Sequence, residues 1–210
     1  MSTIESQITQ MYETKCETPS DINQHLPTLM EYAQQAETIV ECGVRNIVST
    51  WAFLKGLLSN NSSTKKLVCV DIQKDHSIDN VIQLVNQHVD MQFIEANSAT
   101  VHIPHNYDIL FIDTWHVYGH LKRELEHHHS KVNKWIIMHD TEVDKILGES
   151  IRCGSNIQQQ MLQTGYSYED VLNGLQKAIT EFLQAHPEWQ IEKVFTNNNG
   201  LTILKRVSKN

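Results

Sequence analysis

Two apolar segments in the middle of the chain end abruptly in polar residues. Residues 107–112 read YDILFI and stop at 113–116 (DTWH), whereas residues 135–138 read WIIM and stop at 139–141 (HDT). Neither segment alternates apolar and polar positions, which is typical of strands buried on both faces of a sheet. In such sheets, ligands bind just beyond the carboxyl ends of the strands. The two carboxylates and two imidazoles at these ends therefore indicate a functional site.

Strands and helices are expected to alternate from about residue 39 onward. Strand patterns occur at 39–41, 66–70 and 91–96, and helical spacing occurs at 50–58, at 78–88 and after Val117. This alternation, with short loops, predicts an α/β fold with a doubly wound, mostly parallel, Rossmann-like sheet.

The C-terminal third has a different pattern. A long helical pattern covers 158–185, with a break expected near Gly165. Two further strand patterns, 189–195 and 201–206, flank an Asn-Gly turn at 199–200, which predicts an antiparallel hairpin.

The length and the patterns predict a single domain. The chain has 210 residues, which is enough to bury a substantial core. Residues 1–37 are expected to form a helical cover of the same domain, 38–207 the α/β domain that carries the strand ends, and 208–210 a tail.

Composition and charge exclude several classes of protein. With 40% hydrophobic and 20% charged residues, the chain is neither disordered nor fibrous. A net charge of -8 without a basic stripe argues against nucleic-acid binding. The four cysteines form no CxxC pair, and no apolar segment resembles a signal peptide or a membrane span. A cytoplasmic location is therefore expected.

The first strand ends carry residues suited to a nucleotide-like ligand. Gly43 follows Glu41-Cys42 and allows a ligand to approach the backbone, but the G-x-G-x-x-G loop of nicotinamide-binding proteins is absent. An acidic residue before this glycine suits a ligand that carries an amino group. Asp71, at the next strand end, can accept hydrogen bonds from ribose hydroxyls, although helix capping is the alternative. Ser49 or Thr50 is expected to cap the helix that follows Gly43.

These residues, together with D-x-x-H-x-Y at 113–118 and HDT at 139–141, resemble class I S-adenosylmethionine-dependent methyltransferases. More narrowly, they resemble the metal-dependent branch that contains cephalosporin-hydroxylase-like proteins and macrolide-sugar O-methyltransferases. The resemblance covers about residues 38–206 and implies a seven-stranded sheet whose last strand is antiparallel. It also implies cofactor contacts. These are Glu41 and Gly43 at the methionine part, Asp71 at the ribose, Ala96, Asn97 and Ser98 at the adenine, and Asp113 beside them.

The later strand ends suggest a metal and a base. Asp113 and Asp140 are hard oxygen ligands suited to Mg²⁺. His139 stands where the family often has Glu. If its imidazole binds the ion, Mn²⁺ or Fe²⁺ are alternatives to Mg²⁺; if it points away, only Asp113 and Asp140 bind the ion. By the resemblance, His116 is the expected general base. The run at 127–129 is interpreted as a solvated helix end, because three adjacent histidines on a helix cannot face one ion.

The leading hypothesis is metal-assisted O-methyl transfer from S-adenosylmethionine to a small hydroxylated, sugar-like acceptor. Two alternatives stay open at this point, namely a catalytically inactive binding protein of the same fold and a different Rossmann-like enzyme. Acceptor specificity is expected to lie in 1–37 and 142–165. The sequence leaves the acceptor and the oligomeric state open, including a homo-oligomer.

Overall fold

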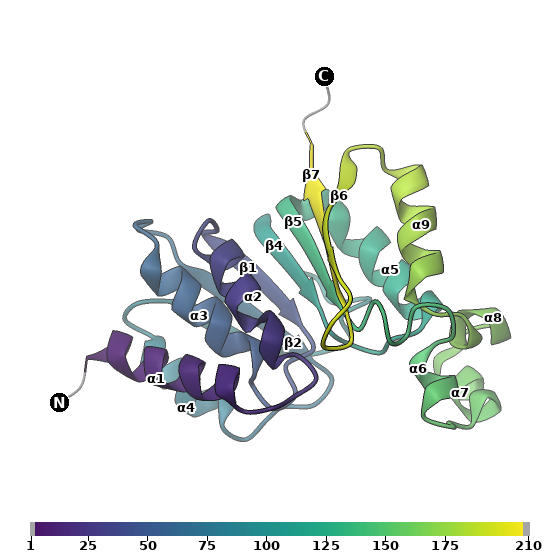
Figure 1. The fold of residues 1–210 in the computed structure, drawn as a ribbon, viewed down its shortest axis with the longest axis horizontal. Coiled ribbons are helices and arrows are strands. Elements are labelled where there is room, and N and C mark those ends of the chain that lie inside the picture. The colour runs from purple at the N-terminus through teal and green to yellow at the C-terminus, as the bar shows by residue number, and fades with distance from the viewer. Residues whose placement is uncertain (1–2, 208–210) are drawn as a thin grey trace.

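The strands of the protein form one mixed sheet in a computed structural model that describes residues 3–207. Within this part of the chain the sheet has seven strands in the order β3-β2-β1-β4-β5-β7-β6 (Figure 1). The strands are β1 Thr38–Cys42, β2 Lys66–Asp71, β3 Asp90–Glu95, β4 Tyr107–Ile112, β5 Val132–His139, β6 Trp189–Phe195 and β7 Leu201–Arg206. The strands β1 to β5 pair in parallel, and β7 lies antiparallel between β5 and β6. The predicted sheet and hairpin are confirmed, and the predicted tail 208–210 lies outside the described residues.

Helices cover both faces of this sheet (Figure 1). One face carries α1 (Ile4–Glu17), α2 (Leu26–Ala33), α3 (Ser49–Ser59) and α4 (Ile78–Val85). The other face carries α5 (Tyr118–His128) and α9 (Leu175–Ala185). Shorter helices complete the chain, namely η1 Asn23–His25, η2 His129–Lys131, α6 Glu149–Arg152, α7 Ile157–Thr164 and α8 Tyr168–Leu172.

Two hydrophobic cores explain why the central strands show no alternation. In β4, Ile109 and Phe111 belong to the core shared with α1 to α4, whereas Leu110 and Ile112 belong to the core shared with α5 and α9. All four side chains are at most 4% exposed. Because both faces of β4 are covered, every position along it favours an apolar residue, and the strand ends are the first places where polar groups meet solvent.

Several boundaries differ from the predictions. The helix expected over 78–88 ends at Val85, and the long helical pattern at 158–185 is divided into α7, α8 and α9. Gly165 ends α7 in a left-handed conformation (φ 73°), as expected, and Ser167 and Asp170 form a capping box that starts α8. A second break at 173–174 was not predicted; there Gly174 packs so closely on the backbone of Asp144 that a Cβ would overlap it.

The interpretation of residues 127–129 as a solvated helix end is wrong for the middle histidine. His128 is 1% exposed, its Nε2 donates to the carbonyl of Ser98 (2.8 Å), and its Nδ1 accepts from the hydroxyl of Tyr107 (2.6 Å). His127 hydrogen-bonds the carbonyl of Val101 through Nε2 (2.7 Å). The two histidines thus hold the loop that follows β3, because imidazole N–H groups satisfy its carbonyls.

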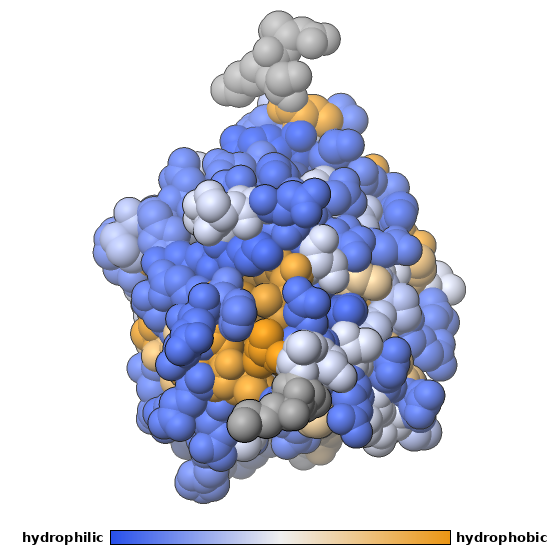
Figure 2. Space-filling view, turned by 90° about the vertical axis from the view of Figure 1, so that its left-hand side faces the viewer, coloured by the Kyte–Doolittle hydropathy of each residue, from blue (hydrophilic) through white to orange (hydrophobic). Residues whose placement is uncertain are grey.

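Across residues 3–207, no helix combines the length and the apolar character that a membrane span requires. The face that carries α1 and α4 is mostly hydrophilic but shows one apolar area (Figure 2). On this side Ile4 and Ile82 are partly buried against the core. Such areas are common at protein contacts, and the oligomeric state stays untested.

Candidate active site

The turn after β1 is pressed against the end of β4. Gly43 has φ 88°, and a Cβ at this position would overlap the backbone oxygen of Asp113. The Gly43 N–H donates to the carbonyl of Val70 (2.9 Å), and the Asp113 N–H donates to that of Cys42 (2.8 Å). A side chain would therefore have to separate two strand ends that are bonded together. Glycine is required here by both the left-handed conformation and the close approach.

Asp71 shapes the loop that follows Gly43. Its Oδ2 accepts hydrogen bonds from the backbone N–H groups of Val44 (2.8 Å) and Arg45 (3.1 Å), and its Oδ1 accepts from that of Gln73 (3.1 Å). Arg45 and Ile47 have positive φ values of 37° and 53°. Positive φ is unfavourable for such residues and is found where the surrounding contacts enforce it, commonly at functional sites. The carboxylate at the end of β2 thus fixes the conformation of the β1–α3 loop.

Glu41 is placed behind this loop. Its carboxylate is fully buried and accepts hydrogen bonds from Ser49 Oγ (2.5 Å), Thr50 Oγ1 (2.8 Å) and Cys69 Sγ (3.3 Å). Burial raises its pKa to about 7, although these hydrogen bonds act in the opposite direction. The expectation that Ser49 or Thr50 caps α3 is wrong, since the N-cap is Val48 and both hydroxyls bind Glu41 instead. The contact of Glu41 with a cofactor stays a prediction.

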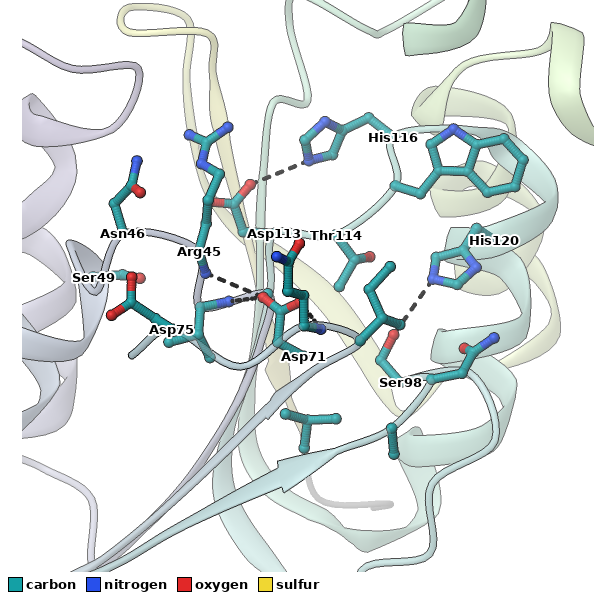
Figure 3. Close-up of a pocket in the computed structure, with 18 of the residues that line it drawn as sticks. Arg45, Asn46, Ser49, Asp71, Asp75, Ser98, Asp113, Thr114, His116 and His120 are labelled. Atoms are coloured by element: carbon teal, nitrogen blue, oxygen red, sulfur yellow. Dashed lines mark hydrogen bonds and ion pairs between the residues drawn. The ribbon is translucent and has the colours of Figure 1, made fainter. Parts of the chain in front are cut away.

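A cavity of about 890 Å³ opens along the carboxyl ends of β1, β2, β3 and β4 (Figure 3). Among the residues expected at a cofactor, all except Glu41 line it. They are Gly43, Asp71, Ala96, Asn97, Ser98 and Asp113. The segments expected to set acceptor specificity also contribute side chains, among them Asp21, Glu149 and Thr164. The cavity is large enough for a nucleoside ligand together with a second small molecule.

A buried polar network supports the wall of this cavity beyond β3. Glu124 has no exposed surface and accepts hydrogen bonds from Ser98 Oγ (2.5 Å) and Thr114 Oγ1 (2.9 Å), with His120 Nε2 at 3.5 Å. Burial alone would raise the pKa of Glu124, but His120 and the two hydroxyls together hold it below its usual value. The sequence analysis missed Glu124, and the only signal was an acidic residue on the apolar face of α5.

At the ends of β4 and β5, two histidines and two aspartates lie in contact. His116 lies between the carboxylates, with Nε2 3.1 Å from Asp113 Oδ1 (Figure 3). Its Nδ1 is 3.1 Å from Asp140 Oδ2. Burial opposes its protonation, but Asp113, Asp140 and Glu149 outweigh that effect and raise its pKa to about 9. Burial would raise the pKa of Asp113, yet His116 and His139 hold it well below its usual range. In this state His116 is an imidazolium that hydrogen-bonds Asp113 through Nε2, while its Nδ1 lies within ion-pair distance of Asp140 without hydrogen-bond geometry.

His139 points toward the same carboxylates. Its Nε2 faces the carbonyl oxygens of Asp21 (3.0 Å) and Asn198 (3.2 Å), so this nitrogen carries a proton. Its Nδ1 faces Asp113 Oδ1 (3.3 Å) and Asp140 Oδ2 (3.5 Å). The alternative in which His139 points away from the site is therefore wrong. The N-terminal segment and the β6–β7 turn orient this imidazole, which no local sequence pattern could indicate.

Three of these side chains form a group that could hold a cation. Asp113, His139 and Asp140 each offer one ligand atom, and these atoms lie within 4.8 Å of one another. Asp140 Oδ1 is buried without a hydrogen-bond partner in the described chain, and Asp140 has φ 57°. A histidine that ligates a metal commonly donates its other ring N–H to a backbone carbonyl, as His139 does. His139 and Asp140 are buried beneath the cavity, whereas Asp113 and His116 line it.

Residues after β5 complete this region, and the sequence analysis did not assign them roles in it. Asp144 is fully buried, accepts two hydrogen bonds from Arg152 (2.7 and 2.8 Å) and lies 3.6 Å from His116 Nδ1. Glu149 Oε2 accepts from the backbone N–H of His116 (3.2 Å). The loop from Asp140 to α6 therefore positions His116 by charge and by hydrogen bonding.

The sheet order, the Gly43 turn, the carboxylate at the end of β2 and the cavity above them define a protein of the class I methyltransferase fold. Residues 40–141 match the family model described as a methyltransferase domain, in agreement with the class I resemblance. No curated protein matches the sequence. The narrower resemblance to the cephalosporin-hydroxylase-like branch stays a prediction.

Solved structures agree on the fold. An O-methyltransferase from Bacillus cereus in complex with SAH has a TM-score of 0.55 and 14% identity, covering 99% of this chain and 92% of that one. The N-methyltransferase NodS from Bradyrhizobium japonicum WM9, in complex with S-adenosyl-l-homocysteine, has a TM-score of 0.58 and 7% identity, covering 99% and 100%. The SAH-bound methyltransferase PaMTH1 from Podospora anserina has a TM-score of 0.56 and 11% identity, covering 99% of this chain and 89% of that one. At these identities the likeness establishes the fold alone.

Proposed function

We propose that the protein is an S-adenosylmethionine-dependent O-methyltransferase that uses a divalent metal and acts on a small hydroxylated acceptor. The observation that carries this proposal is the placement of Asp113. It lines the cavity beside Gly43 and Asp71, and its carboxylate also belongs to the group formed with His139 and Asp140. One residue thus joins the region expected to hold the methyl donor to the region expected to hold a cation.

The cofactor is proposed to lie along the strand ends. Gly43 leaves room at the methionine part, Asp71 offers its remaining lone pairs to the ribose, and the loop from Ala96 to Ser98 borders the adenine. The Asp71 carboxylate has two oxygens and already accepts hydrogen bonds from three backbone N–H groups, so the loop is set before a ligand arrives. Such preorganisation lowers the entropic cost of binding.

The metal is proposed to be held by Asp113, Asp140 and His139, with Mg²⁺ expected and Mn²⁺ or Fe²⁺ favoured to the extent that the imidazole binds. When bound, a cation would neutralise the carboxylates that raise the pKa of His116 and would acidify an acceptor hydroxyl. His116 would then be a neutral base at the cavity wall. Glu149 would still accept a hydrogen bond from the backbone N–H of His116 and so hold the loop.

The proposed reaction is a single displacement. The acceptor oxygen attacks the methyl carbon of the sulfonium, the carbon–sulfur bond breaks, S-adenosylhomocysteine leaves, and the hydroxyl proton passes to His116. The proton would be taken by a His116 nitrogen that the cation frees from its carboxylate, since Asp113 and Asp140 each lie 3.1 Å from one of the two nitrogens in the state described here. The similar structures include both O- and N-methyltransferases, so they do not determine which acceptor atom is methylated. We propose a hydroxyl oxygen because the site is rich in carboxylates.

Activity on a panel of sugars, polyols and catechols with Mg²⁺ or Mn²⁺ tests this proposal through release of S-adenosylhomocysteine. We expect release above background with at least one acceptor, and its loss in His116→Gln and in Asp140→Asn. A matched control is Asp79→Asn, because Asp79 is an exposed aspartate outside the cavity lining.

One observation favours a second candidate, a binding protein of this fold that does not catalyse. His116 has both nitrogens directed at carboxylates, which is unsuited to a base in the state described here. That candidate predicts cofactor binding without turnover on any acceptor and no effect of His116→Gln on binding. A nicotinamide-dependent enzyme is disfavoured by the single-glycine turn and by the match to a methyltransferase domain.

A further inference from the structure

A second group of metal-binding side chains lies away from the cavity, where the ends of two helices meet. We call Glu126, His129, His186 and Glu188 the helix-end cluster. Glu126 lies in α5 and His129 directly follows it, whereas His186 follows α9 and Glu188 precedes β6. The two helices lie side by side on one face of the sheet (Figure 1). The fold therefore assembles the cluster from residues 126–188, and within the described chain none of the four lines the cavity.

His186 lies at the centre of the cluster. Its Nε2 is 3.3 Å from Glu126 Oε1, and its Nδ1 is 3.6 Å from Glu188 Oε1. The ring of His129 lies 4.0 Å from that of His186 between centroids. One ligand atom from each of Glu126, His129 and His186 lies within 4.8 Å of the other two. Ligands on a tetrahedral zinc ion, at bond lengths of about 2.0–2.2 Å, are about 3.3–3.6 Å apart, so small side-chain rotations would close the set.

His129 is the member whose present surroundings leave a nitrogen unused. Its Nδ1 is buried and has no hydrogen-bond partner in the described chain, and the nearest carboxylate oxygen, on Glu188, is 3.8 Å away. Burial first, and then the neighbouring His186, lower the pKa of His129. Buried nitrogens without partners are uncommon and call for an explanation.

Charge and access also suit a cation. The two carboxylates outweigh the single guanidinium nearby, that of Arg206, which donates to the backbone oxygen of His129 and lies over the ring of Trp189. The Glu126 side chain is 50% exposed, whereas those of His129 and His186 are 17% and 18% exposed. An ion could thus enter from solvent past Glu126 and keep a water molecule as a further ligand.

We infer that the helix-end cluster is a structural zinc site, in which His129, His186 and Glu126 bind the ion and Glu188 orients His186. Two imidazoles with a carboxylate favour Zn²⁺ over Mg²⁺, because imidazole is a poor ligand for Mg²⁺. The ion would join the end of α5 to the end of α9, two helices that also meet through apolar contacts and through the Lys122–Glu181 ion pair. This inference does not rest on methyl transfer.

Zinc titration of the full-length, chelator-treated protein by calorimetry tests the inference. The parent for the test carries Asp140→Asn and Cys153→Ser, which weaken the proposed active-site metal group and remove an exposed thiol. We expect one site of micromolar or tighter affinity and a rise in Tm with zinc. Glu126→Gln and His186→Gln should each weaken binding about tenfold or more and reduce the rise in Tm.

His88→Gln, which removes an exposed histidine outside the cluster, should leave zinc binding unchanged. The inference is overturned if the parent shows no saturable binding, or if Glu126→Gln and His186→Gln bind zinc as the parent does. Should His186→Gln fail to fold, Glu126→Gln decides, because its side chain is half exposed and Glu126 belongs to neither hydrophobic core. Binding of S-adenosylhomocysteine is measured in parallel, so failure of the zinc site and failure of the proposed function are told apart.

Discussion

The contact between Gly43 and the backbone of Asp113 makes a quantitative prediction for Gly43→Ala. Two costs are expected. A left-handed φ costs an L-residue about 1–2 kcal/mol, and a methyl group forced against fixed backbone costs about 1–3 kcal/mol more. The free energy of unfolding should therefore fall by about 2–5 kcal/mol.

Gly154→Ala is the matched control for this substitution. Gly154 has φ 63°, and a Cβ there would meet nothing within 4 Å. This variant should lose only the conformational part, about 1–2 kcal/mol. The difference between the two variants isolates the close approach of the β1 and β4 ends.

Urea unfolding and calorimetry with S-adenosylhomocysteine measure the two consequences. Displacing Gly43 also moves the N–H groups of Val44 and Arg45 away from Asp71, so affinity should fall about tenfold or more in Gly43→Ala only. Equal losses of stability in both variants would refute the close packing of the strand ends. Unchanged affinity in a folded Gly43→Ala protein would refute the role of this turn in binding.

Three further perturbations test other parts of the site. Glu41→Gln should weaken the pH dependence of stability, because the pKa of Glu41 is about 7 in the folded protein and 4.5 ordinarily, so that the native state binds more protons between these pH values. In urea unfolding from pH 5 to 8, the wild type should therefore lose about 2–3 kcal/mol of unfolding free energy relative to the variant. Parallel curves of stability against pH for the two proteins would contradict the burial of this carboxylate. Asp71→Asn should weaken binding of S-adenosylhomocysteine about tenfold, whereas Asp79→Asn should bind it as the wild type does. Equal affinities of the two variants would show that Asp71 does not contact the cofactor. His139→Ala should weaken Mn²⁺ binding about tenfold or more in a paramagnetic relaxation titration, whereas His88→Ala should bind Mn²⁺ as the wild type does. If His139→Ala also binds Mn²⁺ with wild-type affinity, the imidazole is not a ligand of the metal.

The strand ends were predictable because apolar runs buried on both faces stop where polar groups reach solvent. This pattern located Asp113 and Asp140 and, with the resemblance, assigned the fold. The hairpin was also predictable, since Asn198, Asn199 and Gly200 all have positive φ, which these residue types tolerate. Local patterns sufficed wherever the cause was itself local.

Tertiary contacts account for what the sequence analysis missed. Ser49 and Thr50 have the residue types of helix caps, yet the buried Glu41 requires their hydroxyls. His139 is oriented by carbonyls of Asp21 and Asn198, which are separated from it by 118 and 59 positions. No periodicity in a single sequence carries such pairings, because they arise only when the N-terminal segment and the hairpin turn meet over β5.

Calorimetric titration with S-adenosylmethionine, in the presence of Mg²⁺ and then of Mn²⁺, tests the central claim most directly. The account predicts saturable binding at one site with micromolar affinity, weakened about tenfold in Asp71→Asn and unchanged in Asp79→Asn. Absence of binding up to high micromolar cofactor, in a protein shown to be folded, would contradict the assignment of the cavity to a methyl donor.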